Sequence, residues 1–129
     1  MGYGMTTRVR EPFAETVERV RAALKDQGFG VLTEIDVRAT LRDKLGEEME
    51  DYLILGACNP PLAHRALGID RQIGLLLPCN VVVRSDGGDT VVEALDPQVM
   101  VSVSGQPAFK PVAEEAAGRL AAALDTLRP

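Results

Sequence analysis

The chain has 129 residues, a length typical of one domain with its own hydrophobic core. Its formal net charge is −5 and no segment concentrates lysine and arginine, which argues against nucleic acid as a partner. The longest apolar stretch, residues 75–83, is interrupted by proline and asparagine and is much shorter than a membrane-spanning helix, so we expect no membrane partner.

The first residues and the number of cysteines indicate in which cellular compartment the protein is expected. Residues 1–6 are glycine-rich and lack the apolar run of an export signal, and the chain has two cysteines. We therefore expect a cytoplasmic protein with reduced thiols. The predicted organisation is a flexible N-terminus over residues 1–6 followed by a single domain over residues 7–128.

The first half of the domain alternates between strand and helix signals. A strand is predicted around residues 7–10, and apolar residues then recur at helical spacing from Pro12 to Leu24. Residues 29–37 alternate with the period of a strand that has one apolar face, formed by Phe29, Val31, Thr33, Ile35 and Val37. A short helix is expected to follow, opened by Thr40 and closed by Gly46.

The second half predicts more strands. Residues 52–58 have strand length and composition, and Asn59 with two prolines opens a short helix. Residues 73–84 are predicted to be a long strand interrupted at Pro78. A turn at Gly87 and Gly88 leads to a hairpin partner over 90–95, which residues 99–103 are expected to extend. Residues 112–127 have the spacing of an amphipathic helix.

The order of these elements is β-α-β-α-β-α-β-β-α, with no glycine-rich phosphate-binding loop after any strand. A hairpin near the C-terminus favours a mainly antiparallel sheet over a doubly wound parallel one. The predicted fold class is therefore α+β, with helices packed on one face of the sheet.

An acidic pair stands out on the predicted strand over 29–37. Glu34 and Asp36 are two residues apart, so both carboxylates leave the same face, opposite the apolar row. Two such carboxylates hold a cation or divide acid and base roles where their environments differ. The alternative is a solvated acidic face at the end of a strand.

Two similar dipeptides carry the thiols. Cys58 precedes Asn59, the predicted N-cap of a helix, where the helix dipole favours a thiolate. Cys79 is followed by Asn80 next to Pro78, another point where a strand is disturbed. The alternative for both cysteines is burial as small apolar side chains, and Asn59 alone accounts for a helix cap.

Metal and histidine motifs are weak. The spacing of the cysteines lacks a C-x-x-C pair, so thiolates and acidic residues form a metal site only where the fold gathers them. The one histidine, His64, has no nucleophile motif near it and is expected on a helix surface. Asp96 before Pro97 is expected in a turn.

Read together, the pieces Glu34-Ile35-Asp36, Cys58-Asn59-Pro60 and Pro78-Cys79-Asn80 resemble the domain of unknown function 302 family. The resemblance extends over roughly residues 8–127 and includes Asp96, while His64 lies outside the family pattern. It implies a compact α+β fold, similar in outline to the TATA-binding-protein-like class, and a frequent homodimer. It implies no established activity, and the cofactor, if the domain has one, stays unknown.

Three hypotheses of function follow. The first is a binding module for a small ligand or metal, at a cleft lined by six residues: Glu34, Asp36, Cys58, Asn59, Cys79 and Asn80. The second is a thiol-dependent redox or nucleophilic enzyme that uses Cys58 with Cys79. The third is a homodimeric assembly domain with structural cysteines, paired through the apolar edge around residues 75–83.

Overall fold

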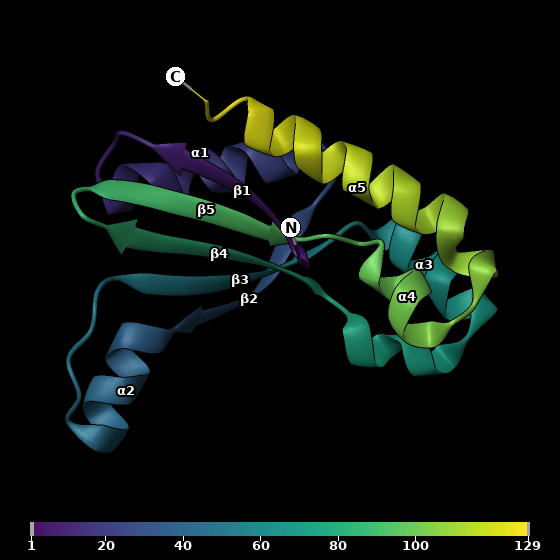
Figure 1. The fold of residues 1–129 in the computed structure, drawn as a ribbon, viewed down its shortest axis with the longest axis horizontal. Helices are drawn as coiled ribbons and strands as arrows, with labels where there is room; N and C mark the ends of the chain where they lie inside the picture. The colour runs from purple at the N-terminus through teal and green to yellow at the C-terminus, as the bar shows by residue number, and fades with distance from the viewer. Residues whose placement is uncertain (1, 129) are drawn as a thin grey trace.

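The structure, a computed structural model, describes residues 2–128; Met1, the first residue of the predicted flexible N-terminus, lies outside this range. Five antiparallel strands form one sheet in the order β1-β5-β4-β3-β2, and helices pack on it (Figure 1). The predicted α+β class with a mainly antiparallel sheet is confirmed. The strands are β1 (Gly4–Val9), β2 (Gly30–Asp36), β3 (Tyr52–Cys58), β4 (Cys79–Asp86) and β5 (Asp89–Leu95). The helices are α1 (Phe13–Asp26), α2 (Val37–Leu45), α3 (Pro60–Ile69), α4 (Val99–Ser104) and α5 (Lys110–Asp125), with 3₁₀ helices η1 (Arg71–Leu76) and η2 (Pro107–Phe109).

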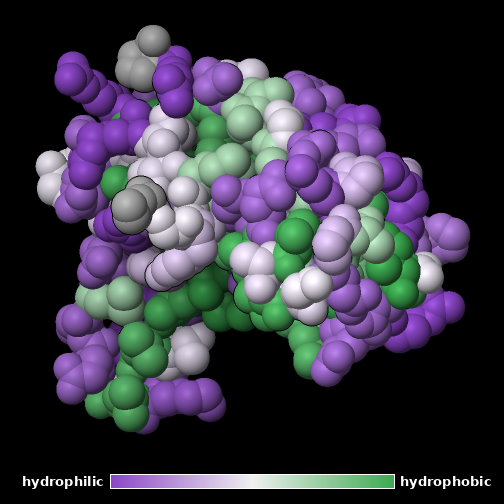
Figure 2. Space-filling model, turned by 45° about the vertical axis from the view of Figure 1, so that its right-hand side comes forward, coloured by the Kyte–Doolittle hydropathy of each residue, from purple (hydrophilic) through white to green (hydrophobic). Residues whose placement is uncertain are grey.

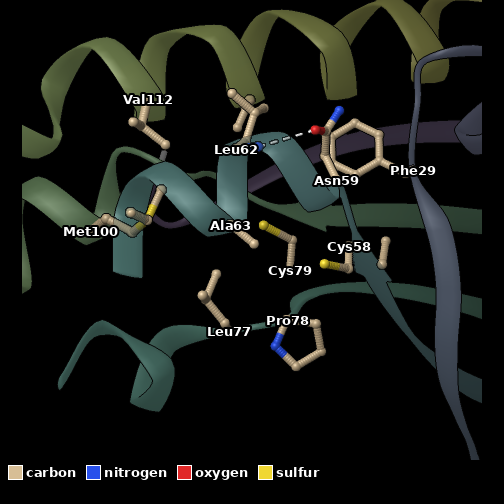
Figure 3. A pocket seen from close by; sticks show the side chains of 13 residues that line it. Phe29, Cys58, Asn59, Leu62, Ala63, Leu77, Pro78, Cys79, Met100 and Val112 are labelled. Carbon is tan, nitrogen blue, oxygen red and sulfur yellow. Dashed lines mark hydrogen bonds between the residues drawn. The ribbon is translucent and has the colours of Figure 1, made fainter. Parts of the chain in front are cut away.

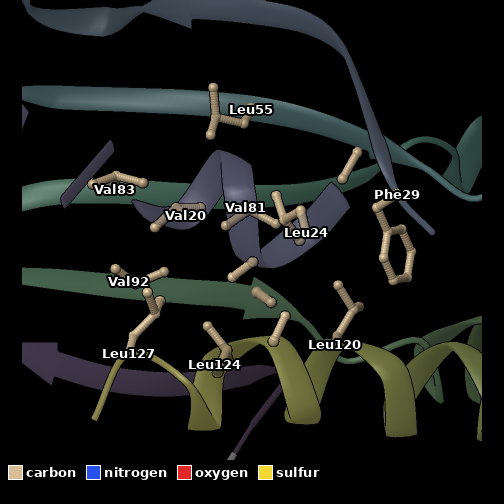
Figure 4. Packing of buried hydrophobic residues seen from close by; sticks show 14 of the residues in the cluster. Val20, Leu24, Phe29, Leu55, Val81, Val83, Val92, Leu120, Leu124 and Leu127 are labelled. Atoms are coloured by element: carbon tan, nitrogen blue, oxygen red, sulfur yellow. The ribbon is translucent and has the colours of Figure 1, made fainter. Parts of the chain in front are cut away.

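One face of the sheet is covered by α1 and α5, which lie side by side across the strands (Figure 1). The apolar stripe predicted for each helix supplies this contact, with Val20 and Leu24 from α1 and Leu120 and Leu124 from α5. They pack on alternate residues of the central strands, such as Leu55, which is completely buried (Figure 4). This main core fixes the position of every strand.

A second, smaller core lies at one end of the sheet, where α3, η1 and α4 pack beside the first half of α5. Leu62, Ile73, Met100 and Phe109 are its largest buried side chains. The two cores meet at the ends of β3 and β4. Cys79 belongs to the main core at this junction.

Two predicted strand segments are helical. The strand expected over 73–84 begins only at Cys79, because residues 71–76 form η1, which Asp70 caps by accepting a hydrogen bond of 3.0 Å from the Gln72 amide. The expected extension over 99–103 is α4, which ends at Gly105 with a φ of 68°. Both segments are short and apolar, and Ile73 from the first and Met100 from the second are buried in the second core rather than on a sheet face.

The predicted apolar face of β2 is also wrong beyond Val31. The register against β3 shifts between Val31 and Thr33, so this bulge moves the following residues to the opposite faces. Glu34 and Asp36 therefore lie on the side of the sheet that α1 covers, and Ile35 lies on the open side, 49% exposed. The next helix, α2, is capped by Asp36 rather than Thr40, since Asp36 Oδ1 accepts from the Ala39 amide at 2.9 Å.

The opposite face of the sheet has no helix across it within residues 2–128. Two segments project from this side: α2 from the β2 edge and η1 from the far end (Figure 1). Gly56 lies on the same face, where a Cβ atom would come within 2.1 Å of Thr33 Oγ1 and 2.8 Å of Pro78 Cγ. Glycine at this position lets β2 and the Pro78 turn approach β3 closely. Within the described range, no helix is both long and apolar enough to cross a membrane.

Candidate thiol site

The two cysteines lie at the junction of the cores, although 21 positions separate them in the sequence. Cys58 is the last residue of β3, and Cys79 is the first residue of β4. Ala57 pairs with Cys79 in the ladder between these strands, so the thiols come from neighbouring positions. Both side chains point into the space below α3, between Ala63 and Pro78 (Figure 3).

The space that the thiols line is small and mainly apolar. Its volume is about 30 Å³, enough for a particle the size of a water molecule. The wall around the two cysteines is formed by Phe29, Leu62, Leu77, Pro78, Met100 and Val112, with alanines from β3, α3 and α5. A cavity of this size has room for a single atom or ion beside the two sulfurs.

Burial controls the chemistry of Cys79. The side chain is 8% exposed, and desolvation, followed by the proximity of Cys58, raises its pKa to about 11. Cys79 is therefore a neutral thiol at neutral pH, with roughly one molecule in ten thousand ionised. Cys58 is only partly buried, so it is the more accessible sulfur of the pair. Both thiols are free, with no disulfide between them.

Asn59 acts as a helix cap. Its Oδ1 accepts a hydrogen bond of 3.3 Å from the Leu62 amide, and its backbone carbonyl accepts from Ala63 at 2.9 Å. The first two helical residues, Pro60 and Pro61, have no N–H to offer. The first turn of α3 therefore has no free backbone donor for a Cys58 thiolate, and this part of the argument for an activated nucleophile fails.

The other three predicted residues lie elsewhere. Glu34 forms an ion pair with Arg21 of α1 at 2.6 Å, and Asp36 caps α2. These carboxylates line a separate hollow between α1 and the β2 edge. Asn80 is exposed on the open face of the sheet. The structure thus brings together Cys58, Asn59 and Cys79, and it separates them from the acidic pair and from Asn80.

The thiol site offers too few ligands for zinc or calcium. Among residues 2–128, no group of three or more histidine, cysteine or acidic side chains is placed to hold a metal ion. Zinc sites in proteins use three or four such ligands, and calcium uses six or more oxygens. His64 lies exposed on α3 and does not line the cavity. The thiol pair is therefore a site with two protein ligands.

Sequence reasoning missed most of the wall. Met100 reaches the cavity from α4, a segment predicted to be a strand, and Phe29 and Leu62 show only the apolar character of any core residue. Pro78 was visible as a motif residue, and its peptide bond with Leu77 is cis. No local pattern signals that these residues meet, because the contact depends on how α3 and α4 pack.

Comparisons with known proteins agree with the fold. The crystal structure of an uncharacterized conserved protein, DUF302, from Bacillus stearothermophilus is 35% identical in sequence, with a TM-score of 0.93 over 99% of this chain and 100% of that one. The fluoride-specific ion channel FluC 1 of Brucella suis biovar 1 (strain 1330) is 34% identical over 88 residues, which are 67% of this chain and 34% of that protein. FluC 2 of Brucella melitensis biotype 1 has the same identity over 67% of this chain and 32% of its own length.

The match to the two Brucella proteins therefore spans about a third of their length. The full-length match is to a family: the sequence model described as "Domain of unknown function DUF302" covers residues 5–127. Both the predicted family resemblance and the complete structural overlap with the Bacillus protein lead to the same assignment. This chain belongs to the DUF302 family.

Proposed function

We propose that the domain is a non-catalytic binding module that holds one soft monovalent cation, such as Cu(I), between Cys58 and Cys79. The observation that carries the proposal is the convergence of both thiols on one cavity of about 30 Å³. Thiolates are the ligands that Cu(I) prefers in proteins. The proposal assumes the predicted cytoplasmic location, in which thiols stay reduced.

The number and type of ligands support this choice of cation. Zinc, calcium and magnesium require more ligands than the two that the site offers. The cavity wall is apolar, which keeps water from the sulfurs. Cys79 must release its proton to bind the cation, so the apparent affinity rises with pH. The high pKa of Cys79 makes this dependence steep up to pH about 11.

The match to about a third of the Brucella channels fits a module that accompanies other segments in longer proteins. A binding role suits such an arrangement, because a compact domain of this kind retains its site wherever it is inserted. We propose no channel activity for this chain, because the match covers only about a third of those proteins.

Thiol-dependent catalysis is the weaker proposal. In a dithiol–disulfide cycle, Cys58 would attack a low-molecular-weight disulfide and release one thiol, and Cys79 would then displace the second thiol to close an S–S bond. The second step needs the Cys79 thiolate, and the raised pKa of Cys79 leaves it scarce at neutral pH. The same proximity of sulfurs that supports cation binding therefore supports only a slow exchange.

The test is an anaerobic titration of reduced protein with Ag(I), a redox-stable analogue of Cu(I), followed by native mass spectrometry. We expect one ion per chain in the wild type, and no retention above background in Cys58→Ala, Cys79→Ala or the double variant. Asn80→Ala is the matched control and should bind as the wild type does, because Asn80 does not line the cavity of the two thiols and faces a separate hollow.

Two results would overturn the proposal. One is a wild type that retains no more silver than the double variant. The other is independent binding, in which the wild type takes two ions and each single variant keeps one. Incubation with oxidised glutathione checks the alternative: a disulfide formed within minutes at neutral pH, detected by a loss of two mass units, would favour exchange chemistry over cation binding.

A further inference from the structure

The cavity of the two thiols has a third sulfur in its wall. Met100 lines it from α4 and is only 5% exposed, so its thioether is buried as the Cys79 thiol is. Apart from the three sulfur-bearing residues, the wall consists of apolar side chains and of Asn59, whose Oδ1 caps α3. Thiolates and thioethers are the soft donors that select Cu(I) among the metal ions of cells. Met100 is therefore the one further soft donor in the described wall of this cavity.

A turn at the end of β5 places Met100. Asp96 Oδ1 accepts a hydrogen bond of 3.0 Å from the Gln98 amide, and the Pro97 carbonyl accepts one of 3.0 Å from the Met100 amide. Pro97 is almost completely buried. The Asp96 amide donates to the Tyr3 carbonyl at 2.8 Å, which ties the turn to the residue before β1. The Asp96-Pro97 turn thus fixes the start of α4 and brings Met100 to the cavity.

The charge of the site favours a neutral third donor. Two thiolates around one monovalent cation leave an excess of negative charge, and an apolar wall solvates a further negative group poorly. Figure 2 shows apolar residues on the lobe of η1 and α4, where Leu75 is 79% and Val103 is 66% exposed. Among residues 2–128, no carboxylate lines the cavity. A thioether donates an electron pair without adding charge, so Met100 meets the requirement.

The flexibility of methionine allows the thioether to reach the cation. In the view of Figure 3, Ala63 lies between Met100 and Cys79, and an alanine leaves space at this point. Methionine has three rotatable side-chain bonds and adapts to irregular gaps in a core. Ligation therefore requires only that the Met100 side chain turn toward the thiols, while the backbone of α4 keeps its place.

We propose that Met100 is the third ligand of the bound cation and makes the site selective for Cu(I) and its analogue Ag(I). This role of Met100 rests on the proposed function, because it assumes a cation held between Cys58 and Cys79. It narrows the ligand to soft monovalent cations that accept a thioether. Zinc prefers thiolate, imidazole and carboxylate ligands, so a thioether does not complete its set. Hg(II) is satisfied by two thiolates in a line and gains nothing from Met100.

The first test is the affinity for Cu(I), measured without oxygen by competition with a chromogenic Cu(I) chelator. Met100→Leu removes the sulfur and keeps an apolar side chain of similar volume, with the fold monitored by circular dichroism. Loss of a group that only orients a metal ligand costs about 10- to 100-fold in affinity, and we expect the loss of this thioether to cost about tenfold.

Two controls accompany this variant. Met5→Leu removes a thioether from β1, which does not line the cavity, and it should bind Cu(I) as the wild type does. Hg(II) should bind Met100→Leu as tightly as the wild type, because both thiols are still present. An equal loss of Cu(I) and Hg(II) affinity in Met100→Leu would mean that the substitution disturbs the thiols, and it would contradict the selectivity that we propose.

The second test counts the sulfur neighbours of bound Cu(I) by X-ray absorption spectroscopy. We expect three in the wild type and two in Met100→Leu, a difference that a packing role of Met100 would not produce. Two sulfur neighbours in the wild type would overturn the role of Met100, and so would an unchanged Cu(I) affinity in Met100→Leu. Should Met100→Leu fail to fold, the sulfur count of the wild type still decides.

The two proposals fail in different ways. If Met100 has no part in the site, Cu(I) still binds to the wild type and is lost in Cys58→Ala and Cys79→Ala, so the proposed function stands. If the wild type retains no Cu(I), the proposed function and the role of Met100 are both overturned.

Discussion

The two faces of the sheet carry similar sequences and have different environments. On the covered face, Leu55 and Val83 are completely buried beneath α1 and α5. On the open face, their neighbours Ile54 and Val82 are only partly buried. The comparison shows that the alternation of side chains along a strand identifies which residues share a face, but it does not tell which face is covered by helices. On the covered face, the cover comes from two helices elsewhere in the chain, α1 and α5.

The largest expected effect is a difference in stability between substitutions on the two faces of one strand, β3. Leu55→Ala leaves a cavity under the helices and should lower the free energy of unfolding by about 3 kcal/mol. Ile54→Ala, one residue away, should lower the free energy of unfolding of the isolated monomer by about 1 kcal/mol, because the Ile54 side chain is already partly exposed to water. Urea unfolding of both variants measures the difference.

Protein concentration sharpens this comparison. Where the open face is covered by a second copy, unfolding of the wild type depends on concentration, and the cost of Ile54→Ala grows as concentration increases. The cost of Leu55→Ala should stay the same over that range. Equal costs for the two variants at every concentration would mean that the faces are energetically alike, against the burial seen in the structure.

Alkaline pH probes the thiol junction between the two cores. The pKa of Cys79 is raised in the folded state to about 11, so the folded protein binds this proton more tightly than the unfolded chain does. Its contribution to stability is present below the unfolded pKa, near 9, and is lost as pH rises through 11. The upper limit of the loss is about 3 kcal/mol, given a pKa shift of about two units.

The measurement compares the wild type with Cys79→Ala by urea unfolding from pH 8 to pH 11. Other groups titrate in this range in both proteins, so the difference between the two curves isolates Cys79. We expect the gap between wild type and variant to shrink toward pH 11. A gap that is independent of pH would show that Cys79 ionises as readily in the folded protein as in the unfolded chain.

Sequence patterns predicted the elements that have strong local signals. The stripes of α1 and α5, the turn at Gly87 and Gly88 and the limits of β3 all followed from spacing and turn residues. Residues 73–77 and 99–103 failed, because short apolar segments fit a buried strand and a buried helix equally well. Only the packing of the second core decides between them.

The candidate site was predictable in part for the same reason. Cys58 ends β3 and Cys79 begins the adjacent β4, so antiparallel pairing brings their backbone positions close together. Glu34 and Asp36 were displaced by a bulge that no sequence pattern announces. Asn80 follows Cys79 directly, and strand alternation turns it to the open face. The position of the bulge and the sheet face that each side chain takes depend on tertiary packing, and residue spacing alone does not predict them.

The smallest effect should appear at the two capped helices. Asn59→Ala and Asp36→Ala each remove a side chain that accepts a backbone amide, a change worth about 1 kcal/mol. Helix α3 buries Leu62 and Ala66 in the second core, so loss of its cap should lower the global free energy of unfolding. Helix α2 buries nothing within the chain, so loss of Asp36 should hardly change global stability.

Hydrogen exchange distinguishes the two outcomes. In a monomer, Asp36→Ala should speed exchange in residues 37–45 alone, because α2 frays without unfolding the sheet. In a homodimer that pairs through the open face of the sheet, α2 would be held by the second copy, so the wild type should protect these amides and Asp36→Ala should also weaken association. Rapid exchange of 37–45 in a wild-type dimer would mean that α2 lies outside the interface, and the contact would then be confined to the floor of the open face.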